Sequence, residues 1–314
     1  MSVLQAPFPW FGGKSRIAHV VWDRFGDVPN YVEPFAGSLA VLLARPHEAR
    51  TETVNDLDCY LANFWRAVKC SPEEVAAHAD WPVNEADLLA RHRWLLARTD
   101  FRERMRAEAD YFDAKVAGWW AWGICSWIGS GWCRVRGDGP PSQLPHLGNA
   151  GRGLHRKLPH LGDAGSGSAV LAWLEALSAR LRRVRVACGD WTRILGESVT
   201  VKHGITAVLL DPPYSSDEHS VAYGASSGDV AGAVRQWAIT NGDNPALRIA
   251  LCGYEGEHTM PSSWACVPWK TKGGYASQGN GTGRENSARE RVWFSPHCLS
   301  DSRIAPLFAE GGAA

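Results

Sequence analysis

The chain has 314 residues, of which 45% are hydrophobic and 21% are charged, and this composition excludes wholesale disorder. Lys+Arg and Asp+Glu both number 33, so the formal net charge is zero and a nucleic-acid partner would have to be recognised by local charge. Tryptophan is unusually frequent, with 16 residues against 9 Phe and 7 Tyr.

The eight cysteines are scattered and form no CxxC pair, so the sequence gives no support for a zinc site and we expect no metal. No charged segment followed by an apolar run opens the sequence, so no signal peptide is visible. We therefore expect a reducing, cytoplasmic location.

The first 70 residues alternate β-like runs with turns and helical patterns. We expect strands over residues 31–33 and 51–55, and helices over residues 38–45 and 57–69. Residues 72–128 are mostly helical in pattern, rich in Ala, Arg, Glu and Trp.

An uncharged stretch of 18 residues, 116–133, approaches the length of a membrane span. Its glycines and serines favour a buried or ligand-lining helix followed by a Gly-rich loop, so we expect no membrane insertion. Five tryptophans lie here, and the sequence leaves core packing and base contact equally open for them: Trp119, Trp120, Trp122, Trp127 and Trp132.

Residues 129–168 are packed with Gly, Pro and His, and LPHLGNAGRG (144–153) recurs as LPHLGDAGSG (158–167). Five basic side chains oppose two aspartates, so this neutral chain carries a local positive charge. A long loop of this kind is usually functional or mobile. The basic residues are Arg134, Arg136, Arg152, Arg156 and Lys157.

Strands and helices alternate again after this loop. A helix is expected over residues 169–182, followed by strands over 184–188, 206–210, 248–252 and 291–294. The alternation predicts an α/β domain with a mostly parallel sheet. We expect a discontinuous catalytic domain (1–70 and 169–300), a helical and Gly/Pro-rich insertion (71–168) and a C-terminal tail (301–314).

Two acidic motifs follow the first two expected strands. In YVEPFAGS (31–38), a strand ends in a carboxylate before a Gly turn, and its small residues would let a ligand approach the backbone. In VNDLD (54–58), an acidic side chain could accept both hydrogen bonds of a ribose diol, or could cap the next helix. The pattern is not GxGxxG, which favours a nucleoside-containing ligand other than NAD.

The strongest motif is LLDPPY (209–214), in which an apolar strand runs into Asp, two prolines and an aromatic residue. The prolines stiffen the exit of the strand, so that the Asp211 carboxylate, the Pro212 carbonyl and the Tyr214 ring can face one pocket. Two acceptors beside an aromatic plate fit an exocyclic amino group on a flat heterocycle. At the N-terminus, FPWFGGK (8–14) adds aromatic rings, a glycine pair and Lys14.

The motifs FGGK, EPFAGS, NDLD and DPPY, in that order, resemble those of the Dam-like (D12 class) N6-adenine DNA methyltransferases. Phage-encoded and bacterial orphan enzymes of this class have similar N-terminal stretches. The resemblance covers residues 7–66 and about 184–294. It implies a Rossmann-like sheet with helices on both faces, which binds S-adenosylmethionine, and a DNA-recognition insertion.

The resemblance also implies residue roles. Trp10 and Lys14 would contact the methionine part of the cofactor, and Asp56, or less favourably Asp58, would hold its ribose. Asp190 and Trp191, in a GDF-like element, would hold its adenine. The implied cofactor set is Trp10, Gly12, Gly13, Lys14, Glu33, Pro34, Phe35, Ala36, Gly37, Ser38, Asp56, Asp190, Trp191 and Asp211. Leu39 departs from the family, because many relatives have a second glycine there.

The implied catalytic set is Asp211, Pro212, Pro213 and Tyr214, acting on the N6 amino group of an adenine flipped out of double-stranded DNA. DNA phosphates would be bound by the five basic residues of the insertion, with residues 180–185 and 270–291 as further candidates. A solitary modifying enzyme of a bacterial cell or a phage-infected host is the simpler hypothesis, and a monomer is compatible with it.

Three alternatives remain at this point. An N4-cytosine methyltransferase more commonly has SPPY, so Asp211 favours adenine. A non-catalytic DNA-binding protein with this fold would not need Asp211, Tyr214, Asp56 and Lys14 intact. An enzyme acting on protein glutamine usually shows NPPY, and no RNA-binding module is evident for one acting on RNA.

Overall fold

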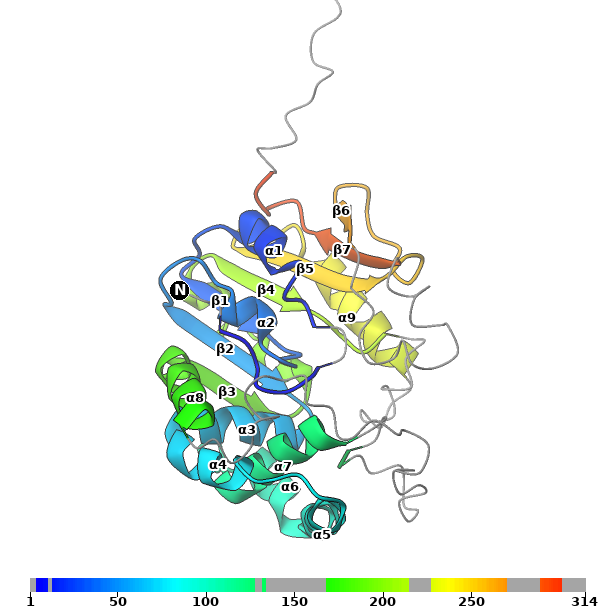
Figure 1. Cartoon of the computed structure of the whole chain (residues 1–314). Coiled ribbons are helices and arrows are strands. Elements are labelled where there is room, and N and C mark those ends of the chain that lie inside the picture. Colours follow the sequence, from blue (N-terminus) through cyan, green and yellow to red (C-terminus); the bar gives the residue numbers. More distant parts are fainter. Residues whose placement is uncertain are drawn as a thin grey trace, which may run out of the picture.

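The computed structural model describes residues 4–10, 13–127, 132–133, 168–214, 227–269 and 289–300. Within them the chain forms one seven-stranded sheet with helices on both of its faces (Figure 1). The strands are β1 (Asn30–Glu33), β2 (Thr51–Asp56), β3 (Val184–Cys188), β4 (Thr206–Leu210), β5 (Leu247–Tyr254), β6 (Ala265–Pro268) and β7 (Glu290–Phe294).

The strand order is β3-β2-β1-β4-β5-β7-β6. Strands β1 to β5 run parallel, whereas β7 is antiparallel to both β5 and β6. The chain moves outward from β1 through β2 to β3 and then returns to place β4 against the other side of β1. The order therefore reverses between β1 and β4, which is where open α/β sheets form their ligand crevice.

Alternating side chains of the buried strands supply two separate cores. In β4, Ala207 and Leu209 belong to one core, and Val208 and Leu210 belong to the other. Helix α9 covers the second face, and the remaining helices with core residues cover the first. The α-helices are α1 (Ala18–Phe25), α2 (Ala40–Leu43), α3 (Cys59–Cys70), α4 (Pro72–Ala79), α5 (Glu85–Leu96), α6 (Thr99–Ala107), α7 (Ala114–Ser126), α8 (Ser168–Leu181) and α9 (Ser227–Asn241).

The Rossmann-like α/β fold expected from the sequence is confirmed, and every expected strand is present. Strand β6 was missed, because it is only four residues long, is mostly exposed and ends in proline. Helix α2 is shorter than the expected 38–45, because Leu39 adopts a positive φ of 54° and delays the start of the helix.

Helix α7 is the buried helix expected within residues 116–133. Within the described ranges, no helix is long and apolar enough to cross a membrane. The open question about the tryptophans is settled for four of them: Trp120, Trp122, Trp127 and Trp132 are buried in the core. Trp119 is half-buried.

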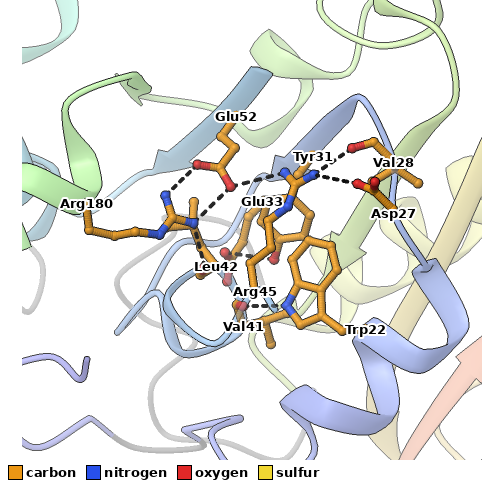
Figure 2. Close-up of polar contacts among 10 residues, drawn as sticks. All are labelled: Trp22, Asp27, Val28, Tyr31, Glu33, Val41, Leu42, Arg45, Glu52 and Arg180. Atoms are coloured by element: carbon orange, nitrogen blue, oxygen red, sulfur yellow. Dashed lines mark hydrogen bonds and ion pairs between the residues drawn. The ribbon is translucent and has the colours of Figure 1, made fainter. Parts of the chain in front are cut away.

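A buried ion cluster lies between β2, helix α8 and the segment that follows α2 (Figure 2). The Glu52 carboxylate lies 3.2 Å from Arg45 Nη1 and 2.7 Å from Arg180 Nη1. The Arg45 guanidinium also donates to the Val28 carbonyl and lies 5.1 Å from the centre of the Trp22 ring. Every member of the cluster is thus paired, which is what a buried charge requires.

Candidate active site

Three carboxylates meet at one edge of the sheet, because their strands are neighbours. Glu33 is the last residue of β1, Asp56 is the last residue of β2, and Asp211 directly follows β4. Since the three strands run parallel, their carboxyl ends face the same side. The site therefore lies at the crevice where the strand order reverses.

The turn after β1 approaches β2 closely. The Ala36 N–H donates to the Asn55 carbonyl at 2.8 Å, and the Gly37 N–H donates to Asp56 Oδ2 at 3.1 Å. Gly37 has a φ of +48°, and a Cβ at this position would lie 2.7 Å from Trp10 Nε1. Glycine is therefore required here both by the backbone and by the close contact with Trp10.

The N-terminal segment closes one side of this turn. A Cβ built on Gly13 would lie 3.6 Å from the Trp10 carbonyl and 4.0 Å from Ser38 Oγ, which places these residues together. Leu39, the departure from the family pattern, holds the left-handed backbone conformation that glycine adopts without strain. Its side chain is fully buried in the core.

Asp56, the last residue of β2, and Asp58, which lies just beyond the strand, have different roles. Asp58 is the N-cap of α3, since its Oδ1 accepts from the Tyr60 and Leu61 N–H groups. Asp56 accepts from the Gly37 and Asp58 N–H groups. Burial, reinforced by the charge of Asp58, raises the pKa of Asp56 to about 7. This separates the candidate ribose ligand from the structural cap.

Glu33 is buried, and its Oε2 accepts a hydrogen bond of 3.0 Å from the Tyr31 hydroxyl. Burial raises its pKa well above the usual range, and the charges of Asp211 and Asp56 add to this. No Lys, Arg or His of the described ranges forms an ion pair with Glu33 or Asp56. A pair of buried acceptors lacking a cation fits a ligand that brings hydroxyl donors and positive charge.

Asn55 is a site residue that the sequence reasoning did not single out. Its side-chain amide donates to the Pro34 carbonyl at 3.1 Å and to the Gly189 carbonyl at 2.9 Å. It thereby joins the turn after β1 to the turn after β3. The sequence feature that could have identified Asn55 is its position in the NDLD motif, directly before Asp56.

The turn after β3 carries Asp190 and Trp191. Asp190 Oδ1 accepts from Thr192 and begins the short 3-10 helix η2 (Trp191–Ile194). The Trp191 ring is nearly parallel to the Phe35 ring, at an angle of 25° and a centroid distance of 6.2 Å. Phe35 belongs to the second core, and Trp191 packs against that core.

Asp211 lies within a second group of polar side chains. Lys14 Nζ is 2.9 Å from Asp211 Oδ2. The Tyr214 hydroxyl lies 3.2 Å from Asp211 Oδ1 and 2.9 Å from Glu290 Oε2. Burial alone would lower the pKa of Lys14, but the charges of Asp211 and Glu290 reverse this and raise it, so the lysine stays charged.

Several sequence-based candidates fall outside the described residues: Gly12, Arg134, Arg136, Arg152, Arg156, Lys157 and the repeat within 144–167. Two of the further phosphate candidates are already paired inside the protein. Arg180 binds Glu52, and Arg291 lies 2.8 Å from Glu255. Neither is available as an unpaired cation for a phosphate group.

The seven-stranded sheet is consistent with the Rossmann-like fold of methyltransferases. More narrowly, residues 10–116 match the family model of the D12 class N6 adenine-specific DNA methyltransferases, which supports the expected Dam-like class. No curated protein matches the chain. The described part of the chain contains no group of three or more side chains that could hold a metal ion together.

The family match covers roughly a third of the chain and contains Trp10, Lys14, Glu33 and Asp56. It ends before β3, so the arrangement around Asp211 stands on the geometry of the structure. The matching family acts on N6 of adenine, which favours adenine over the N4-cytosine alternative.

Proposed function

We propose that the chain transfers a methyl group from S-adenosylmethionine to N6 of an adenine flipped out of double-stranded DNA. The observation that carries this proposal is the convergence of Glu33, Asp56 and Asp211 at the strand-order reversal. Two of these carboxylates are buried without an ion-pair partner in the described part of the chain, and the third lies beside Tyr214.

The chain's own residues provide a binding surface that matches the parts of this cofactor. Asp56 would accept the ribose hydroxyls, and Asp190 with the Phe35 and Trp191 rings would hold the adenine. Glu33, with Trp10 and the turn 34–38, would lie against the methionine portion. When bound, S-adenosylmethionine supplies an electrophilic methyl group on a positively charged sulfonium.

The N6 lone pair of adenine is delocalised into the purine and is a weak nucleophile. Hydrogen bonds from the N6 amino group to Asp211 and to the Pro212 carbonyl would localise this lone pair and stabilise the positive charge that develops on nitrogen. Pro213 stiffens the backbone that carries them, and the Tyr214 ring would border the base. Rate enhancement then comes mainly from orientation and electrostatics.

The insertion at residues 71–168 would serve DNA recognition. Its basic side chains Arg134, Arg136, Arg152, Arg156 and Lys157 would bind phosphates. Transfer from this cofactor requires no metal, and we expect a cytoplasmic enzyme.

The function is tested with tritiated S-adenosylmethionine and duplex DNA, followed by nucleoside analysis. We expect label in N6-methyladenine. Asp211→Asn should lower the transfer rate by about 10²-fold or more, because one acceptor aimed at developing charge is replaced by a weaker one. Cofactor affinity measured by calorimetry should change little.

Label in cytosine would overturn the base assignment. Full activity of Asp211→Asn would remove the proposed role of that carboxylate. Cofactor binding without label in any DNA would favour a non-catalytic protein.

A further inference from the structure

The sequence motifs do not include Glu290, although its carboxylate lies in the centre of the site. Glu290 is the first residue of β7 and is buried. Its backbone pairs with Tyr254 in β5, and its carbonyl accepts from the Trp269 N–H at 3.1 Å. The Glu290 backbone is thus fixed on both sides by the sheet and its neighbouring turn.

The Tyr214 hydroxyl has one hydrogen and two carboxylate oxygens within reach. Glu290 Oε2 lies at 2.9 Å and Asp211 Oδ1 at 3.2 Å. One hydrogen cannot make a linear bond to both, and the shorter contact is the one to Glu290. The direction of this hydrogen decides whether Tyr214 competes with the substrate for Asp211 Oδ1 or leaves both acceptor positions of that oxygen open.

The other oxygen of Asp211 is already engaged, since Oδ2 lies 2.9 Å from Lys14 Nζ. The ammonium also lies 5.3 Å from the centre of the Tyr214 ring. With Lys14 on one oxygen, a Tyr214 hydroxyl turned toward the other would take one of its two acceptor positions and would compete with the substrate for that oxygen.

We propose that Glu290 is a positioning residue, which takes the Tyr214 hydrogen and so keeps Asp211 Oδ1 available for the N6 amino group. The same hydrogen bond holds the Tyr214 ring, which packs edge-on against Tyr254 at 4.5 Å, in one orientation. Glu290 acts through Tyr214 and does not touch the substrate. The inference rests on the proposed roles of Asp211 and Tyr214.

The test is a double-mutant cycle of Glu290→Ala and Tyr214→Phe, with kcat for methyl transfer and cofactor Kd measured separately. Glu290→Ala should lower kcat by about 10- to 100-fold, since the hydroxyl is then left with Asp211 as its acceptor. Cofactor Kd should stay within about threefold. Adding Tyr214→Phe to Glu290→Ala should restore kcat to the level of Tyr214→Phe alone, because the competing hydroxyl is gone.

Glu255→Ala is the matched control. It removes a carboxylate of the same charge near β7, but Glu255 is paired with Arg291 and is 63% exposed. Its kcat should remain that of the wild type. If the losses from Glu290→Ala and Tyr214→Phe simply multiply, a general structural role explains Glu290 and the inference is overturned. Should Glu290→Ala not fold, Glu290→Gln takes its place, with a smaller loss and the same pattern of coupling.

If the wild type labels no DNA, the proposed function is wrong, but this inference can still be tested. The double-mutant cycle is then measured through the thermal unfolding midpoints of the wild type and the variants. Non-additive shifts for Glu290→Ala and Tyr214→Phe would support the hydrogen bond, and additive shifts would exclude it.

Discussion

Buried carboxylates occur in two regions of this protein, and their hydrogen-bond and ion-pair partners differ. Glu52 lies between two guanidinium groups, those of Arg45 and Arg180 (Figure 2). Glu33, at the end of the neighbouring strand, has the Tyr31 hydroxyl instead of a cation, and its pKa is raised well above the usual range.

Under the proposed function, the difference separates a carboxylate that stabilises the fold from one that binds the cofactor. A buried charge compensated by two arginines is satisfied within the protein. A buried carboxylate with a raised pKa is an unfavourable feature of the protein alone, and such groups gather at functional sites. The same Glu→Gln change, made in both regions, tests this interpretation.

The largest effect is expected from Glu52→Gln. The substitution leaves Arg45 and Arg180 without their carboxylate, and breaking a buried ion pair in this way costs about 3–5 kcal/mol of unfolding free energy. Urea unfolding monitored by fluorescence measures it. Glu255→Gln, which removes an exposed pair with Arg291, should change stability by less than about 1 kcal/mol. Similar small losses for both variants would show that the Glu52 cluster does not support the fold.

Glu33→Gln should show the opposite pattern. Cofactor affinity measured by calorimetry should fall by about 10- to 100-fold, the value of one charge-assisted interaction. The free energy of unfolding should not decrease, because a buried carboxylate that resists ionisation has been removed.

The pH dependence of folding stability tests the effect of Glu33. Since the folded-state pKa lies above the unfolded value, Glu33 favours folding at low pH, and this contribution is lost as pH rises through the folded-state pKa. The stability of Glu33→Gln relative to wild type should therefore increase with pH. A variant that is strongly destabilised at pH 8 yet binds cofactor normally would assign Glu33 to the fold.

The smallest effect concerns Asp56, whose pKa is about 7. A ribose diol donates to the ionised form, so cofactor affinity should weaken by about tenfold between pH 8 and pH 6. Asp56→Asn should bind more weakly at pH 8 and should lack this dependence. Titration calorimetry of both proteins at several pH values makes the comparison. Parallel pH profiles for the two proteins would exclude Asp56 as the titrating ligand.

The parts of the fold and of the site that depend on local sequence patterns could be predicted from the sequence. Short β-like runs identified β1 and β2, and apolar runs identified β3, β4, β5 and β7. The residues that end β1 and β2 or follow β4 identified Glu33, Asp56 and Asp211. The N-cap role of Asp58 was one of two open interpretations, and only the backbone geometry of α3 distinguishes it from Asp56.

Contacts between distant segments could not be predicted in this way. Nothing local connects Arg45 with Arg180, or Tyr214 with Glu290, which are 76 residues apart. The position of β7 between β5 and β6 is a property of the whole sheet, and an apolar run cannot indicate antiparallel pairing. Glu290 was overlooked for this reason.

The placement of β7 between β5 and β6 also has a consequence for synthesis on the ribosome. Strands β1 to β5 can pair before the last strand has emerged, whereas β6 can join the sheet only through β7. Glu33 and Asp56 can thus be in position before Tyr214 gains its hydrogen-bond acceptor at residue 290. Under the proposed function, a nascent chain would acquire its cofactor-binding surface before its catalytic geometry.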